Sequence, residues 1–131
     1  MVAAEGPERL AASYAHCEAL LREGDRDRYL AGLLVPPEAR YHLAALYAFS
    51  LDVARIREVA QQALAGEIRL QWWRDALMDE ARGDVSAHPI AAALLDTIRR
   101  FALPPQPFLD LLDARTFDLY EDTMPTIANL E

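Results

Sequence analysis

The residues of this sequence that could bind a metal ion are carboxylates spaced by one helical turn. Asp75 and Asp79 stand four positions apart, and so do Asp118 and Asp122. Side chains at this spacing share one face of a helix, and two carboxylates in that arrangement can hold Mg²⁺ against a diphosphate. A solvated charged face produces the same pattern and is its more common origin. Asp75 and Asp79 are therefore weak candidate metal ligands, with an ordinary surface as the alternative.

Groups that could act as nucleophiles or bases are present, but their spacing does not suggest a catalytic arrangement. His16, His42 and His88 do not form a metal-ligand pattern. We expect His42 to be a packed or boundary residue and His88 to start a helix. The single cysteine, Cys17, lies in a helical pattern and suits a packing role in a reducing compartment. Neither Cys17 nor Ser50 belongs to a recognisable His-acid arrangement of the kind that activates a nucleophile, so nothing supports nucleophilic catalysis.

The charge and hydropathy of the chain exclude several classes of partner. The sequence has 21 acidic and 13 basic residues, for a formal charge of −8, whereas nucleic-acid binding requires a positive surface. No stretch approaches the roughly 20 uninterrupted apolar residues of a membrane span, and the N-terminus lacks a basic leader followed by an apolar run. We therefore expect a cytoplasmic protein with no nucleic-acid partner and no transmembrane segment.

The apolar residues recur with helical periodicity, and no run alternates as a strand would, which predicts an all-α fold of about six helices. Gly24, Gly66, Gly83 and the Pro104-Pro105 pair are expected to mark helix ends, and Asp25, Pro37 and His88-Pro89 helix starts. The expected helices span residues 8–23, 27–34, 37–64, 67–82, 89–103 and 107–120.

The last residues, Pro125 to Glu131, have the pattern of a helix start, with Thr126 as its cap. One helical turn is not stable alone in water, so we expect residues 1–131 to be a single domain that is truncated at its C-terminus. Such a chain would expose an apolar face, and a homodimer could form through it.

Trp72 and Trp73 are adjacent in an expected helix, so their side chains point about 100° apart. Both cannot face the centre of the same core. We expect one of them to be packed and the other to lie at an edge, a groove or a partner surface.

The segment from Tyr47 to Glu58 resembles the helix that carries the first aspartate-rich motif of squalene and phytoene synthases. In that family, a Tyr-Ala-Phe-Cys-like lead-in precedes Asp-x-x-x-Asp, which holds magnesium against a prenyl diphosphate. The matching positions here are Ala54 and Glu58. Alanine offers no oxygen, and Arg55 adds a positive charge beside the remaining acid. The resemblance therefore implies a degenerate motif.

Other segments resemble the same family in the same order along the chain. Residues 27–36 resemble its Ser-Phe-Tyr-x-Ala segment, with Asp27 and Arg28 in place of serine and phenylalanine. Residues 88–94 resemble its His-Pro helix start, and 117–120 and 125–131 resemble its Met-Asp-Leu segment and the helix start that follows. Residues 66–75 look most like a divergent bacterial branch, related to a mitochondrial complex I assembly factor, that lacks the metal motifs. The fold implied is the N-terminal half of an isoprenoid-synthase-like helical fold.

The resemblance also implies which side chains would face a substrate cavity. These are Tyr29, Tyr47, Phe49, Asp52 and Arg55. Asp52 and Arg55 could form a buried ion pair that fills an abandoned metal site, or an ordinary surface pair.

Three functions remain open at this point. The first is a non-catalytic squalene/phytoene synthase relative that binds a partner protein and perhaps assists assembly of a respiratory complex. The second is a prenyltransferase that condenses prenyl diphosphates and needs Mg²⁺, with a metal site displaced to Asp52 with Glu58 or to Asp75 with Asp79. The third is a helical protein-interaction module. No cofactor is expected unless the second applies, and the partner is either a protein or a prenyl diphosphate-like ligand.

Overall fold

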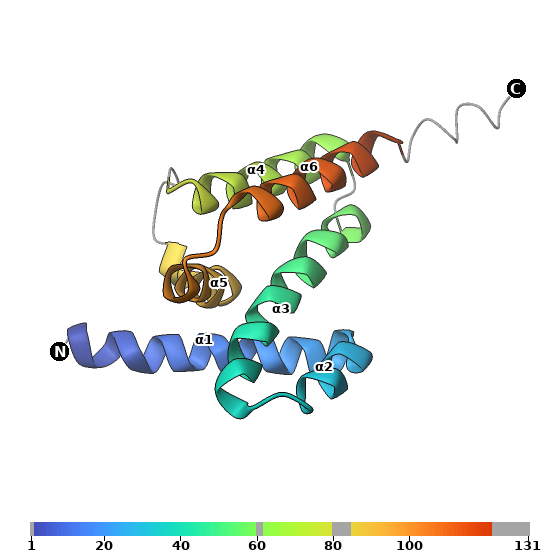
Figure 1. Ribbon diagram of the computed structural model, residues 1–131. Helices are drawn as coiled ribbons and strands as arrows, with labels where there is room; N and C mark the ends of the chain where they lie inside the picture. Colours follow the sequence, from blue (N-terminus) through green and yellow to red (C-terminus); the bar gives the residue numbers. More distant parts are fainter. Residues whose placement is uncertain (1, 60–61, 80–84, 122–131) are drawn as a thin grey trace, which may run out of the picture. The chain divides into compact units, whose positions relative to one another are not determined.

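The structure is a computed structural model that describes residues 2–59, 62–79 and 85–121. Within these ranges the chain forms six α-helices, one short 3-10 helix and no strand, so the predicted all-α fold is confirmed. The elements are α1 (Val2–Gly24), α2 (Arg26–Gly32), α3 (Pro37–Val59), α4 (Ala63–Leu77), η1 (Val85–Ala87), α5 (Pro89–Phe101) and α6 (Gln106–Glu121) (Figure 1).

The helices belong to two compact units. Unit 1 comprises Met1–Leu51 and Arg82–Leu103, and unit 2 comprises Asp52–Ala81 and Pro104–Glu131. The long helix α3 contributes its first part to unit 1 and its last part to unit 2. That residues 1–131 form one domain, cut at its C-terminus, stays a prediction.

In unit 1, α1 packs against both α2 and α5. Its core combines small and large apolar side chains from three helices. The small alanines of α3 and α5 allow the backbones of these helices to approach their neighbours closely. The buried residues include Cys17, Leu21, Ala45, Ala48, Ala91 and Leu94.

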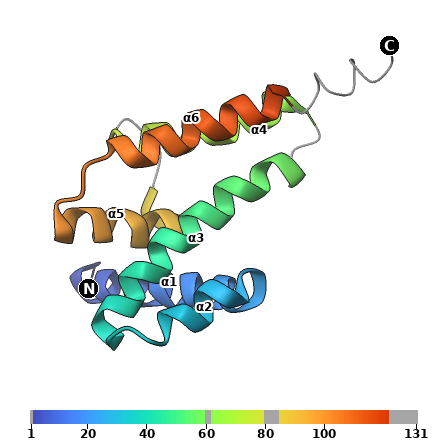
Figure 2. The same ribbon diagram turned by 45° about the vertical axis from the view of Figure 1, so that its right-hand side comes forward.

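In unit 2, α4 and α6 run side by side in opposite directions (Figures 1 and 2). The buried residues include Val53, Ile56, Leu70, Trp73, Leu112 and Leu119. Trp73 is only 2% exposed, whereas its neighbour Trp72 is partly exposed. One tryptophan is thus buried and the other is partly exposed, as the helical geometry predicted.

Local signals place several helix ends where the sequence predicted them. The side chain of Asp25 accepts a hydrogen bond from the backbone N–H of Arg28 at 3.3 Å and so caps α2. Pro37 opens α3, and His88 caps α5 by accepting from Ala91 N–H at 3.2 Å. The first helix extends further than predicted, since Pro7 lies inside α1 rather than before it. A proline near a helix start removes one backbone donor without preventing an earlier start.

The predicted boundaries around α3 and α4 were wrong. Helix α3 ends at Val59 instead of Leu64, and Gly66 is a buried residue inside α4. Gln62 is extended, with φ −131° and ψ 146°, and precedes the new helix. A single glycine costs a helix only about 1 kcal/mol, which packing can offset. Helix α4 ends at Leu77, before the predicted Arg82, and the predicted stop at Gly83 and helix start at 125–131 lie outside the described residues.

No helix in the described part of the chain is both long and apolar enough to cross a membrane.

Candidate functional site

Tyr29 of α2 and Tyr47 of α3, two of the predicted substrate-facing residues, line one small hollow in unit 1. The Arg28 guanidinium lies over the Tyr47 ring, 4.9 Å from its centroid, and donates a hydrogen bond to Ser50 Oγ at 3.5 Å. The hollow has a volume of about 10 Å³, which is room for about one water molecule. The two tyrosines and Arg28 thus line the same hollow, and a substrate-facing role for the tyrosines stays a prediction.

Arg40 fixes the turn that joins α2 to α3 beside this hollow. Its guanidinium donates to the carbonyl oxygens of Gly32 at 3.2 Å and of Leu33 and Val35 at 3.4 Å each. These carbonyls lie at or beyond the end of α2, where the helix cannot satisfy them itself. Arg40 therefore has a structural role that sequence reasoning missed.

Phe49, also predicted to face a substrate, is 1% exposed. A side chain with so little exposure contributes to packing, and it presents no surface to a ligand.

Ala54, which the sequence resemblance matches to the first motif aspartate, lines a second hollow of about 10 Å³ in unit 2. Arg57 of α3 and Arg115 and Asp118 of α6 line the same hollow, and Arg115 pairs with Asp118 at 3.5 Å. Arg115 Nε is buried and has no hydrogen-bond partner in the described residues. Glu58, the other motif position, is exposed. Ala54 offers no oxygen ligand to a divalent cation here, and two of the residues that line the hollow are arginines.

The predicted pairing of Asp52 with Arg55 is wrong. Asp52 Oδ2 instead accepts a hydrogen bond from the indole Nε1 of Trp73 at 3.0 Å, and no ion pair joins Asp52 to Arg55 within the described ranges. The carboxylate satisfies a buried donor on α4, because an indole N–H that is removed from water requires an acceptor. Sequence reasoning missed this pair, since nothing local relates residues 21 positions apart.

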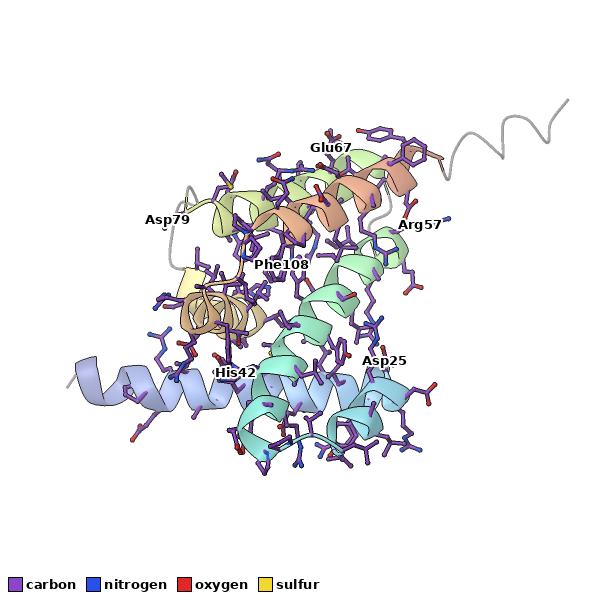
Figure 3. All side chains as sticks on the ribbon, viewed as in Figure 1. Asp25, His42, Arg57, Glu67, Asp79 and Phe108 are labelled. Carbon is purple, nitrogen blue, oxygen red and sulfur yellow. The ribbon has the colours of Figure 1, made fainter. Side chains whose placement is uncertain are left out.

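Asp75 and Asp79 do not share a helix in the structure. Asp75 lies on α4 and accepts from Gln71 Nε2 at 2.8 Å. Asp79 lies beyond the end of α4 with a φ of 58° (Figure 3). The two carboxylates therefore do not lie on one face of a common helix. No group of three or more metal-ligating side chains occurs in the described residues. Asp122, the partner of Asp118 in the other pair, lies outside them.

A polar cluster in unit 1 joins three helices, and the sequence reasoning above did not predict it. The Tyr14 hydroxyl donates to Asp96 Oδ2 at 2.5 Å and lies 3.0 Å from Thr97 Oγ1. His42 Nδ1 lies 3.2 Å from the Tyr14 hydroxyl and 2.9 Å from Thr97 Oγ1. Arg100 Nε donates to Asp96 at 2.8 Å. The cluster satisfies polar groups inside the unit, including Thr97, which is 1% exposed.

The cluster changes the pKa of two of its members. Burial, supported by the hydrogen bond to Asp96, raises the pKa of Tyr14. Burial also lowers the pKa of His42, with a further contribution from the charge of Arg100 that the charge of Asp96 opposes. Both groups are thus held in their neutral forms near pH 7.

Comparison with known proteins supports the resemblance to this family. The family model described as squalene/phytoene synthase matches residues 21–131. The chain belongs to the squalene/phytoene synthase family.

Several known proteins with different names are similar to the chain. It is 30% identical over its whole length to the rat NADH dehydrogenase (ubiquinone) complex I, assembly factor 6, of which it covers 39%. Over 87% of its length it is 34% identical to the Streptomyces coelicolor bifunctional protein CrtB/UppS, covering 20% of that protein. Over 82% of its length it is 32% identical to the Mycobacterium tuberculosis phytoene synthase, covering 34% of it. No solved structure gives a significant match.

The chain therefore spans about two fifths or less of the length of these relatives. That Ala54 and Glu58 match the metal-binding aspartates of the family, and that Tyr29 and Tyr47 match its substrate-side residues, stays a prediction from the sequence resemblance.

Proposed function

We propose that this chain is part of a non-catalytic member of the squalene/phytoene synthase family that assists assembly of a respiratory NADH dehydrogenase complex by binding a protein partner. The helical scaffold of the family is retained, while its first metal-binding motif is replaced. Similarity to the rat assembly factor extends over all of the chain, which supports this function.

The observation that carries the proposal is the environment of Ala54. A catalytic member would need carboxylate oxygens there to hold Mg²⁺ against the diphosphate leaving group. The hollow beside Ala54 is instead lined by Arg57 and Arg115, and Asp118 is paired with Arg115. An alanine in place of one motif aspartate, with arginines beside it and the nearest carboxylate already paired, supports the absence of a magnesium site.

The proposal can be tested by deleting the gene in its own organism and measuring assembled NADH dehydrogenase complex and NADH-dependent quinone reduction. We expect both to be lost, and to be restored equally by the wild-type gene and by a Glu58→Ala variant. Glu38→Ala, at another exposed acid on α3, is the matched control. An unaffected complex in the deletion strain, or failure of Glu58→Ala alone to restore it, would count against an assembly role without catalysis.

A second candidate is a Mg²⁺-dependent prenyltransferase that condenses prenyl diphosphates. Two observations favour it: the 32% identity to a phytoene synthase, and the position of Asp118, which brings one carboxylate to the hollow lined by Ala54. Under this alternative the protein would bind a prenyl diphosphate only with magnesium, and Asp118→Asn would abolish that binding.

A further inference from the structure

Helices α4 and α6 of unit 2 have an outer side that does not contribute to the core. The inner side is marked by buried residues, among them Leu70 on α4 and Leu112 on α6. On the outer side, exposed or partly exposed residues recur at intervals of three and four positions, so they form one stripe along each helix. The stripe on α4 consists of Leu64, Ile68, Gln71 and Asp75, and the stripe on α6 of Asp110, Asp113, Phe117 and Tyr120.

Two side-chain contacts show that these stripes lie next to each other. The Tyr120 hydroxyl, near the end of α6, donates a hydrogen bond to Glu67, near the start of α4. Further along the pair, Arg74 forms an ion pair with Asp113. Since the two helices run in opposite directions, the apolar residues of both stripes meet at one end and the aspartates at the other. We refer to the two stripes together as the outer surface of unit 2.

The apolar half of the outer surface is well exposed. Its four large side chains are between 46% and 64% exposed, and they are Leu64, Ile68, Phe117 and Tyr120. Large apolar side chains that gather on adjacent helices, instead of being scattered singly, are typical of a surface that binds another protein. Aromatic residues such as these two are enriched at the centres of such interfaces.

The acidic half of the outer surface restricts the class of partner. It carries Asp75, Asp110 and Asp113, and the nearby Arg74 is already paired with Asp113. A second copy of the chain would bring these carboxylates against the same carboxylates or against the apolar half, and either arrangement removes poorly compensated charge from water. An anionic lipid surface would be repelled. Lysine and arginine residues of a partner protein would be attracted.

We propose that the outer surface of unit 2 binds an amphipathic helical segment of a partner protein, which places its apolar residues on the apolar half and its basic residues on the acidic half. The stripe on α4 runs from residue 64 to residue 75, about 16 Å at about 1.5 Å per residue, which corresponds to about three turns of a bound helix. Proteins commonly recognise partner helices by such apolar faces. This inference rests on the proposed assembly function, for which it supplies the partner-binding surface.

A matched pair of synthetic peptides tests the proposal. One is an amphipathic helix of about 15 leucine and lysine residues, and the other has glutamate in place of every lysine. Each is labelled with a fluorophore and titrated into the full-length protein, and binding is followed by fluorescence anisotropy. We expect the lysine peptide to bind at least about tenfold more tightly, and added salt to weaken its binding. Equal affinities, or no binding of the lysine peptide because a later part of the same chain covers the surface, would overturn the proposal.

Two pairs of variants locate the binding. Ile68→Ser removes an exposed apolar side chain from the outer surface and should weaken binding of the lysine peptide at least about fivefold. Its control is Leu34→Ser, at an exposed leucine of unit 1, which should bind as the wild type does. Asp110→Asn should reduce both the affinity and its salt dependence, whereas Glu38→Gln, at an exposed acid of unit 1, should change neither. Wild-type affinity in both Ile68→Ser and Asp110→Asn would show that the peptide binds elsewhere.

The outer surface and the assembly function can fail separately. In the deletion strain, Ile68→Ser should restore less assembled complex than Leu34→Ser does, and equal restoration would overturn the surface as the partner site. Specific binding of the lysine peptide, together with an unaffected complex in the deletion strain, would overturn the assembly function and support the surface. A dimer of the full-length protein that Ile68→Ser dissociates would assign the surface to a second copy, contrary to the proposal.

Discussion

The indole Nε1 of Trp73 donates a hydrogen bond to Asp52 Oδ2 at 3.0 Å and links α4 to α3 within unit 2. Trp73 is 2% exposed, so its N–H is removed from bulk water. The bond gives Asp52 a structural role at a position where the family resemblance suggested a substrate-facing residue.

Removing this acceptor should destabilise unit 2. We expect Asp52→Ala to lower the free energy of unfolding by about 1 to 2 kcal/mol, because the Trp73 indole loses an acceptor in a buried position. Asp52→Asn keeps an acceptor oxygen and should cost less. Urea denaturation of both variants measures the difference, and Asp110→Ala, at an exposed acid on α6, is the control. Equal losses in all three variants would argue against a role for the bond.

Tyr14 is expected to be the central residue of the polar cluster in unit 1. Tyr14→Phe removes the hydroxyl shared by Asp96, Thr97 and His42 and leaves their polar atoms with fewer partners. We expect a loss of about 1 to 3 kcal/mol in unfolding free energy. Tyr41→Phe is the matched control, because Tyr41 is 47% exposed. A smaller effect for Tyr14→Phe than for Tyr41→Phe would contradict the cluster's structural importance.

The stability of the protein should depend on pH through His42. Burial and Arg100 lower its folded-state pKa, while Asp96 acts in the opposite direction and Tyr14 faces it as a neutral group. The unfolded state, with a pKa near about 6.5, therefore binds the proton first as pH falls. The contribution of His42 to the free energy of unfolding is fully present above about pH 6.5 and declines as the pH falls through that value. Below the folded-state pKa of His42 this contribution no longer changes with pH.

Urea denaturation of the wild type and of His42→Asn between about pH 8 and pH 5 isolates this contribution from that of the carboxylates. We expect the wild type to lose stability relative to the variant as pH falls. Replacement of the exposed His16 should leave the wild-type pH dependence unchanged. A constant difference between wild type and His42→Asn would refute the role of His42.

Cys17 should be chemically inert in the folded protein. It is fully buried on α1, and burial, with a contribution from the charge of Glu18, raises the pKa of its thiol to about 12. Because the thiolate is the reactive form, a disulfide reagent at about pH 8 should not modify the native protein. In strong denaturant the same reagent should titrate one thiol per chain. Rapid modification of the native protein would mean that α1 opens readily.

The features predicted correctly from sequence are those that depend on neighbouring residues. Asp25, Pro37 and His88-Pro89 mark helix starts because their capping and backbone effects act within one turn. Gly66 misled the boundary prediction because packing inside α4 outweighs the low helix propensity of glycine. The pairs that define the sites, Trp73 with Asp52 and Tyr14 with Asp96, join residues 21 and 82 positions apart, and only the tertiary fold brings them together.

The most direct test of the central claim is calorimetric titration of farnesyl diphosphate into the full-length protein, with and without magnesium. The proposed non-catalytic scaffold, with Arg57 and Arg115 lining the hollow beside Ala54, should show no magnesium-dependent binding. Binding that requires magnesium, and that Asp118→Asn abolishes, would contradict this account and establish a metal site of the kind that prenyltransferases use.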